Sequence, residues 1–193
     1  LKDNVLFTSS FNTISKLESK PIGDFDGLTI PFKRVGNLIM LEATIDEQTG
    51  YFILDTGAPY LVLNNTYFRD YPQIELYASV GATGAGSSTF KTKVEFLSLR
   101  SLRYENLQAD VTDLSEIENV RKVKVLGLLG LGLFKKLVLQ IDYKNNQVQF
   151  YNSNLFQSKE EWTIHPFKLR NNIMSVNGIV NDEKLQFAID SGA

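Results

Sequence analysis

The sequence predicts an all-β fold, mostly strands with one or two short helices. Short apolar stretches alternate with polar residues, as in strands that bury one face. Glycine-rich or polar segments separate these stretches, as turns do. One pattern of strand, polar turn and strand occurs twice, at 31–58 and at 166–193. These three observations together predict a chain built of hairpins.

The composition is that of a globular chain without a strongly charged surface. The chain has 193 residues, 43% of them hydrophobic, enough for a sizeable core in one domain or one domain and part of another. Twenty Lys and Arg stand against 22 Asp and Glu without a long run of one sign, so no nucleic-acid partner is indicated. The longest uncharged apolar run, Val125 to Phe134, is ten residues and too short to be a transmembrane segment.

The repeated pattern aligns without a gap when the sequence is shifted by 135 positions. The identical residues are Pro31, Phe32, Lys33, Asn37, Phe52, Asp55, Gly57 and Ala58, which recur as Pro166, Phe167, Lys168, Asn172, Phe187, Asp190, Gly192 and Ala193. The alternation also survives, with Ile39, Leu41, Ala43 and Ile45 matching Met174, Val176, Gly178 and Val180. A polar turn follows, at 46–50 and 181–184, and then a strand that ends at the aspartate. Each copy is therefore predicted to be a hairpin with Asp-Thr/Ser-Gly-Ala at its tip.

The segments between the two copies are also predicted mainly as strands. They are a strand at 61–63, a glycine-marked turn or loop tip at 81–90, two strands within 90–111, a short helix or loop at 113–120, and at 125–151 a buried strand, a turn of helix at 131–136 and a hairpin turning at 144–146. We expect an N-terminal lead or edge strand at 1–30, one complete lobe at 31–151, a connector at 152–165, and the start of a second, truncated lobe at 166–193.

These motifs carry a family resemblance. Asp55 with Thr56, Gly57 and Ala58 follows an apolar strand, a glycine-rich segment comes at 81–86, and the step Leu128-Leu129-Gly130 precedes the closing hairpin. Together they resemble the retropepsin and pepsin kind of aspartic peptidases, and bacterial tandem-lobe members in particular. The resemblance covers 31–151 and 166–193. It implies a retropepsin-like acid-protease lobe plus the first hairpin of a second lobe, and an aspartic-type endopeptidase with a peptide or protein substrate.

The chemistry of such an enzyme explains why a repeated aspartate matters. Hydrolysis of a peptide bond without a metal or a covalent intermediate needs one group to take a proton from water and another to donate one to the carbonyl oxygen. Two carboxyls within hydrogen-bond distance do both, because they cannot both ionise and so share one proton. The pair then titrates as a unit. The expected catalytic residues are therefore Asp55 and Asp190, with no cofactor and no metal.

The resemblance also assigns roles to the neighbours of the two aspartates. Thr56 and Ser191 are expected to form a hydrogen-bonded bridge between the lobes, and Gly57 and Gly192 to let the backbone pass close to the carboxyls. Many relatives carry Ser or Thr where this chain has Ala58 and Ala193. Loss of that hydroxyl should raise the apparent pKa values of the pair, which favours activity at a milder pH than that of a gastric enzyme.

The glycine-rich segment has two interpretations. By the resemblance it is the tip of a flap that folds over an extended substrate, which binds as an added strand. The flap residues would be Gly81, Ala82, Thr83, Gly84, Ala85 and Gly86. The alternative is an ordinary hairpin loop.

Other motifs are weaker. "GLLGLG" at 127–132 lacks the order of a dinucleotide-binding loop, and "GATGAG" at 81–86 lacks the Lys-Ser/Thr of a phosphate loop. His165 is the only histidine and there is no cysteine, which argues against a metal site and a histidine triad.

The second copy stops after Asp190, without the flap and strands that hold Asp55 in the first. We therefore expect an enzyme that is complete only in a bilobal parent or as a homodimer in which two Asp55 residues meet. A catalytically silent peptide-binding or assembly module with the same fold, and a generic all-β domain, remain as alternatives. An exported protein of the periplasm or cell envelope is expected, because the chain starts without Met and resembles envelope peptidases; a cytoplasmic location stays open.

Overall fold

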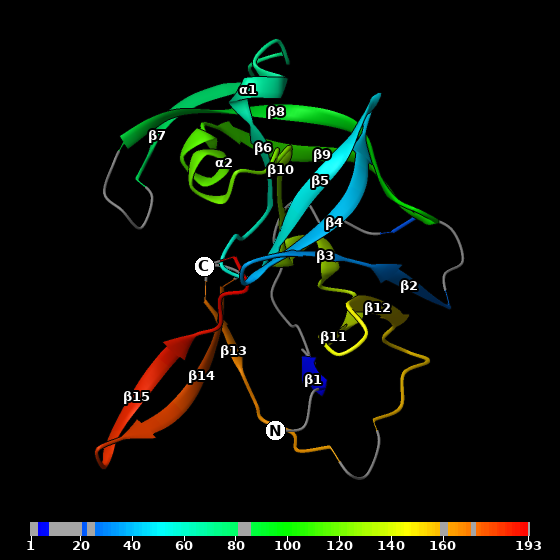
Figure 1. Ribbon diagram of the computed structural model, residues 1–193, viewed down its shortest axis with the longest axis vertical. Helices are drawn as coiled ribbons and strands as arrows, with labels where there is room; N and C mark the ends of the chain where they lie inside the picture. Colours follow the sequence, from blue (N-terminus) through cyan, green and yellow to red (C-terminus); the bar gives the residue numbers. More distant parts are fainter. Residues whose placement is uncertain are drawn as a thin grey trace.

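The protein is described by a computed structural model, in which residues 4–7, 21–22, 26–80, 86–158, 162–170 and 173–192 are placed. Within these residues the strands form three sheets, of eight, four and three strands, with only short helices between them (Figure 1). The predicted all-β class is confirmed. None of the helices in this part of the chain is both long and apolar enough to cross a membrane.

The largest sheet curls into a barrel. Its strands, in spatial order, are β3 (Lys33–Val35), β4 (Leu38–Ile45), β5 (Gln48–Asp55), β10 (Gly127–Gly130), β6 (Leu61–Asn64), β9 (Leu102–Thr112), β8 (Gly86–Leu99) and β7 (Glu75–Val80). The far end of β8 returns to β4, where Ser98 pairs with Thr44. This pairing closes the sheet, so that β4 and β5 have an interior and an exterior face.

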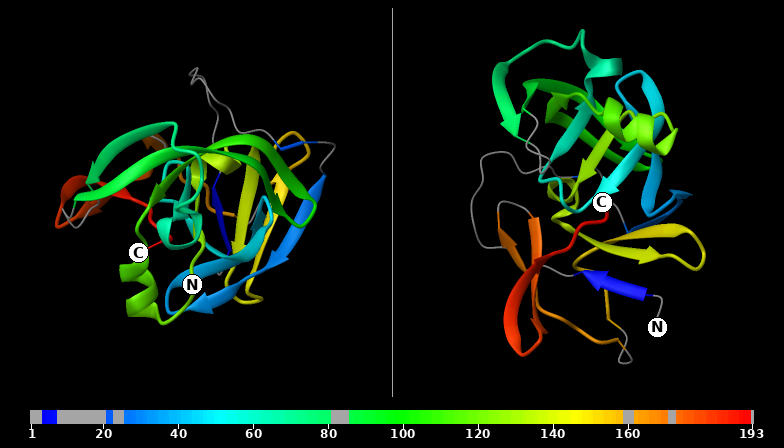
Figure 2. Two further views of the ribbon diagram at one scale, coloured as in Figure 1. Left: turned by 90° about the horizontal axis from the view of Figure 1, so that it is seen from above. Right: turned by 60° about the vertical axis from the view of Figure 1, so that its left-hand side comes forward.

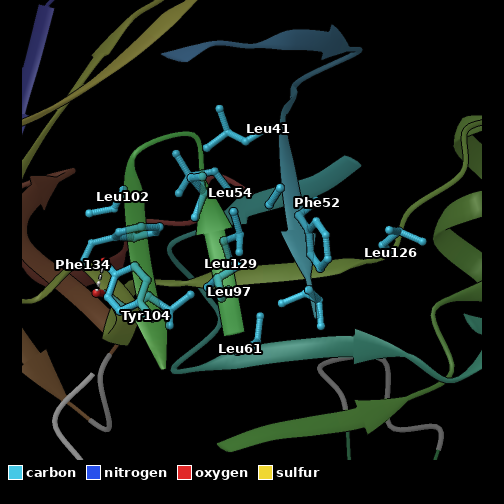
Figure 3. Packing of buried hydrophobic residues seen from close by; sticks show 14 of the residues in the cluster. Leu41, Phe52, Leu54, Leu61, Leu97, Leu102, Tyr104, Leu126, Leu129 and Phe134 are labelled. Atoms are coloured by element: carbon cyan, nitrogen blue, oxygen red, sulfur yellow. Dashed lines mark hydrogen bonds between the residues drawn. The ribbon is translucent and has the colours of Figure 1, made fainter. Parts of the chain in front are cut away.

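The interior of the barrel is filled by large apolar side chains, several of which Figure 3 draws. Phe52, Leu61 and Leu129 are completely buried there. Tyr104 is buried as well, and its hydroxyl donates to Leu133 O at 2.9 Å. Because a buried hydroxyl without a partner is costly, this bond lets a polar tip lie among apolar neighbours. The core therefore supports β5 and β10, the two strands that end near Asp55.

The two hairpins predicted from the repeat are present, with shorter turns than predicted. In β4–β5 the strands pair up to Ile45 and Gln48, so the turn is 46–47 rather than 46–50. In the later hairpin, β14 (Ile173–Val180) pairs with β15 (Glu183–Ala188), so the turn is 181–182 rather than 181–184. Asn181 and Asp182 both have positive φ, the conformation that tight hairpins need and that Asn and Asp tolerate. The predicted turns were too long because solvent-facing polar strand residues resemble turn residues.

The helices are short. α1 (Asn65–Phe68) was not predicted; it begins where the Asn64 side chain accepts from Thr66 N. α2 (Ser115–Arg121) occupies the segment predicted as a helix or loop, and it ends at Lys122 in the left-handed region. The predicted turn of helix is the 3-10 helix η1 (Leu131–Phe134). α1 and α2 connect strands of the barrel, and η1 follows β10.

A four-stranded sheet lies beneath the barrel, in the order β1 (Asn4–Phe7), β11 (Leu137–Asp142), β12 (Gln147–Asn152) and β2 (Gly27–Pro31) (Figure 1). The turn between β11 and β12 is held by the Asp142 carboxylate, which accepts from Lys144 N and Asn145 N, both at 3.0 Å. Of the lead or edge strand expected at 1–30, Asn4–Phe7 forms β1 and β2 begins at Gly27, whereas 8–20 lies outside the described residues.

The third sheet consists of β13 (Lys168–Arg170), β14 and β15, and it projects away from the barrel (Figures 1 and 2). The connector that leads to it is anchored by aromatic contacts. Phe156 lies 5.1 Å from Tyr151 of β12 and 5.9 Å from Trp162, measured between ring centroids. Such ring pairs contribute about 0.5–1.5 kcal/mol each. Figure 2 shows the chain then turning back so that its end lies at the foot of β5.

Candidate active site

The first aspartate lies at the end of a strand that is fixed on both sides. Asp55 is the last residue of β5, and it pairs with Gly130 of the parallel neighbour β10. The chain then turns sharply, and the Asp55 carboxylate accepts from Gly57 N at 2.7 Å and Ala58 N at 3.1 Å. Two backbone donors on one oxygen fix the direction of this carboxylate.

The glycine of the Leu-Leu-Gly step lets β10 lie directly against this turn. A Cβ at Gly130 would collide with Tyr60 O, and one at Gly132 with Pro59 O. Leu131 N donates to Ala58 O at 3.0 Å and Gly132 N to Pro59 O at 3.1 Å. The segment after Asp55 is therefore held against the end of β10 and the start of η1 by close backbone contacts that require glycine.

The second aspartate comes to the same place from the hairpin of the third sheet. β15 ends at Ala188, two residues before Asp190, so the prediction that this strand runs to the aspartate was wrong. Ile189 N still donates to Met174 O of β14 at 2.9 Å, and the chain then crosses to the first turn. Gly192 N donates to Asp190 Oδ1 at 2.8 Å, as Gly57 N does to Asp55.

The two turns meet through a reciprocal set of hydrogen bonds. Thr56 N donates to Ser191 Oγ at 3.1 Å, and Ser191 N donates to Thr56 Oγ1 at 3.0 Å. Each hydroxyl also donates to a carbonyl on the opposite side: Thr56 Oγ1 to Ile189 O at 2.7 Å and Ser191 Oγ to Leu54 O at 2.8 Å. Thr56 is 1% exposed, so these bonds are shielded from water on its side. We call these four bonds the Thr56–Ser191 bridge.

The glycines in the two turns allow the carboxyl groups to approach. A Cβ at Gly57 would lie 2.8 Å from Asp190 Cγ, and a Cβ at Gly192 would lie 2.5 Å from Asp55 Cγ. Each turn thus passes over the carboxyl of the other, at a distance only glycine permits.

The electrostatics at Asp55 follow from this arrangement. Burial and the negative charge of Asp190 raise the pKa of Asp55 to about 6, against the opposing effect of the N–H groups of Gly57 and Ala58. A hydrogen bond between the two carboxyls acts in the same direction as burial, because it needs a proton on one of them. Asp55 therefore keeps its proton in mildly acidic solution.

The structure thus brings together most of the residues that the sequence singled out. Asp55, Thr56, Gly57 and Ala58 face Asp190, Ser191 and Gly192. Ala193 and the predicted flap tip from Gly81 to Ala85 lie outside the described residues. Gly86 is the first residue of β8 and pairs with Val80, so the turn predicted at 81–90 was too long and its second half is strand.

Sequence reasoning missed two participants, the carbonyl groups of Leu54 and Ile189 that accept the bridge hydroxyls. A backbone carbonyl leaves no mark in the residue type. The 135-position repeat could have indicated both, because it aligns Leu54 with Ile189.

Comparison with known proteins agrees with this geometry. Residues 41–133, which carry Asp55, its turn and β10, match the family model described as aspartyl protease. This family match falls on the same residues whose motif resembles that of aspartic peptidases. No curated protein matched. Among solved structures, a retropepsin-like aspartic protease from Rickettsia conorii is similar, with 17% identity, coverage of 65% of this chain and 99% of that chain, and a TM-score of 0.45.

Proposed function

We propose that this chain is an aspartic endopeptidase in which Asp55 and Asp190 form the catalytic pair. The observation that carries the proposal is the Thr56–Ser191 bridge, which joins two turns 135 residues apart so that their carboxyls meet. An arrangement that holds two acids together at the cost of their repulsion is typical of a site that uses them chemically. The match of residues 41–133 to the aspartyl protease family model supports the same reaction class.

The pair would act on a water molecule held between the two carboxyls. The ionised carboxyl takes a proton from the water, and the oxygen of the water adds to the carbonyl carbon of the substrate. At the same time the protonated carboxyl donates its proton to the carbonyl oxygen. In the resulting tetrahedral diol, the carboxyl that took the proton from water passes it to the amide nitrogen. The C–N bond then breaks, and the other carboxyl recovers a proton from a hydroxyl of the diol. The pKa of about 6 at Asp55 suits this exchange, because one acid keeps a proton in mildly acidic solution.

A second body is proposed to cover the hairpin that carries Asp190. Phe187 is 38% exposed and Val180 47% exposed, whereas their repeat equivalents Phe52 and Ile45 are completely buried in the barrel. Exposed apolar side chains at positions whose counterparts form a core favour a protein partner on this face. We propose that the partner is the second lobe of the same protein or another copy of the chain.

The proposal is tested by cleavage of an unfolded protein substrate by the whole enzyme. Asp55→Asn and Asp190→Asn should each abolish cleavage while the circular dichroism spectrum stays unchanged. Asp182→Asn is the matched control, because Asp182 lies in the exposed turn of the same hairpin and Asn tolerates its φ of 64°. Full activity of either dyad variant would exclude a shared pair.

The alternative, a silent module that binds extended peptides, is favoured by one observation. The Asp190 side chain is exposed, although its partner Asp55 is partly buried. Under this alternative the wild-type protein binds an extended peptide and releases it uncut, and Asp190→Asn leaves the affinity unchanged.

A further inference from the structure

The edge of β4 that faces away from β5 has a gap. Both β3 and the end of β8 pair with β4 on this side, since β5 occupies the other edge. β3 pairs with 38–40 and β8 with 44–45, so no strand of the described residues lies beside 41–43 on this edge. We call this interruption the β4 notch.

The pleat of β4 fixes which backbone groups point into the notch. Two-residue hairpins close on both sides of it, at Val35–Leu38 and at Ile45–Gln48, and such closing pairs exchange both hydrogen bonds. Leu38 therefore directs its N–H and C=O toward β3, and Ile45 toward β5. Alternation along the strand then directs the N–H and C=O of Glu42 outward, between the two partners of β4. Neither group has a backbone partner among the residues that the structure describes. A donor and an acceptor of this kind, side by side, form a template for one residue of an added strand.

A cavity of about 460 Å³ lies at the notch, on the outside of the barrel. Its lining includes Lys33, Glu42, Thr44, Tyr51, Ser98 and Arg100. The volume falls within the range of about 300–1,000 Å³ that is usual for ligand sites. The cavity is separate from the dyad, because Tyr51 precedes Asp55 by four strand residues, or about 13 Å.

The charges around the notch favour an anion. Lys33 lies at the β3 end and Arg100 follows the β8 end, so a cation flanks the gap on each side. Both side chains are exposed, and neither has an ion pair within the described part of the chain. Lys33 Nζ lies 5.6 Å from the centroid of the Tyr51 ring, which leaves its N–H groups open to a ligand. Glu42 contributes the single opposing charge.

The shape of the notch selects a chain end over a continuous strand. A strand that ran along β4 would collide with β3 at one end and with β8 at the other, so only two or three residues can pair there. We propose that the β4 notch binds the free C-terminal carboxylate end of an extended peptide. One peptide residue pairs with the backbone of Glu42, and the terminal carboxylate is held by Lys33 or Arg100.

The test is a titration of an N-terminally fluorescein-labelled peptide, Gly-Ser-Gly-Val-Thr-Val, into the whole protein carrying Asp55→Asn, which prevents cleavage. We expect the free acid to bind about two- to fivefold more tightly than the same peptide with a C-terminal amide, the effect of one exposed charge contact. Two further peptides carry a methyl group on the backbone nitrogen, one at the penultimate residue and one at the terminal residue. The methyl group on the residue that pairs with Glu42 should abolish binding of the acid.

Matched variants locate the site. Arg100→Gln or Lys33→Gln should remove the preference for the acid, whereas Lys93→Gln, at an exposed position on β8 away from the notch, should leave it unchanged. Glu42→Gln should increase the affinity about two- to fivefold, since it removes the one opposing charge. Equal binding of acid and amide, an equal loss with Lys93→Gln, or no loss with both Arg100→Gln and Lys33→Gln would overturn the proposal. Because the dyad is disabled in every arm, these outcomes do not depend on whether the chain is a peptidase.

Discussion

Replacement of Thr56 by Val tests whether the Thr56–Ser191 bridge holds the two acids together. Val keeps the shape of the side chain but removes its hydroxyl, so Ser191 N loses its acceptor and Ile189 O its donor. Each net hydrogen bond is worth about 1 kcal/mol, so the two together cost about 2 kcal/mol, or about 30-fold in the equilibrium for separation of the two turns.

Amide hydrogen exchange measures this separation directly. The backbone N–H at position 56 keeps its acceptor, Ser191 Oγ, in the variant, so it reports on opening of the turns rather than on its own lost partner. We expect its exchange to accelerate about 30-fold. Thr49→Val is the matched control, since Thr49 loses only an exposed bond to Thr44 and should change the rate at position 56 less than about twofold.

A double-mutant cycle with Ser191→Ala sharpens the result. Both hydroxyls belong to one network, so removal of the second should cost less once the first is gone. Strict additivity of the two changes, or an unchanged exchange rate in Thr56→Val, would mean that the turns are held by other contacts.

Three further predictions concern acidity and packing. Because the pKa of Asp55 is raised from 3.8 to about 6 on folding, stability should fall as the pH rises from about 4 to 6, and Asp55→Asn should flatten this dependence in thermal melts. Gly130→Ala should lower the urea midpoint of unfolding strongly, because its Cβ would overlap a backbone oxygen. Gly27→Ala is the control, since its Cβ would lie 3.4 Å from the nearest atom and should lower the midpoint only slightly. Equal effects of the two changes would refute the close approach of β10. Ala58→Ser should shift the pH optimum of cleavage downward, and a wild-type optimum below about pH 3 would contradict the role given to Ala58.

Local pattern and repetition made most of the hairpins predictable. The alternation from Ile39 to Ile45 predicts which face of β4 is buried, and the shift by 135 positions predicts the hairpin that contains β14. The burial itself does not repeat, because Val180 is exposed where Ile45 is buried. By contrast, α1 has only four residues and too little periodicity to be recognised. It forms because Asn64 caps it and because Phe68 is buried, both of which depend on the finished barrel.

The site was predictable in its side chains but not in its connections. Both aspartates and the bridge residues Thr56 and Ser191 follow from the motif and its repetition. The parallel pairing of β10 with β5, and the return of β8 to β4, join segments far apart in the chain, so no local signal marks them. The β4 notch is a product of that long-range pairing and was likewise invisible in the sequence.

The reciprocity of the Thr56–Ser191 bridge has a consequence for the timing of activity. The first turn is held by its own strand neighbours, but each turn uses a hydroxyl and a carbonyl of the other to bring the two acids together. A nascent chain on the ribosome, with its first half already folded, therefore carries Asp55 without Asp190 and has no catalytic pair of this kind. Under the proposed function, the peptidase activity of the pair appears only after the β14–β15 hairpin has docked. Unfolded chains near the ribosome are therefore not cut by this pair while the protein is being made.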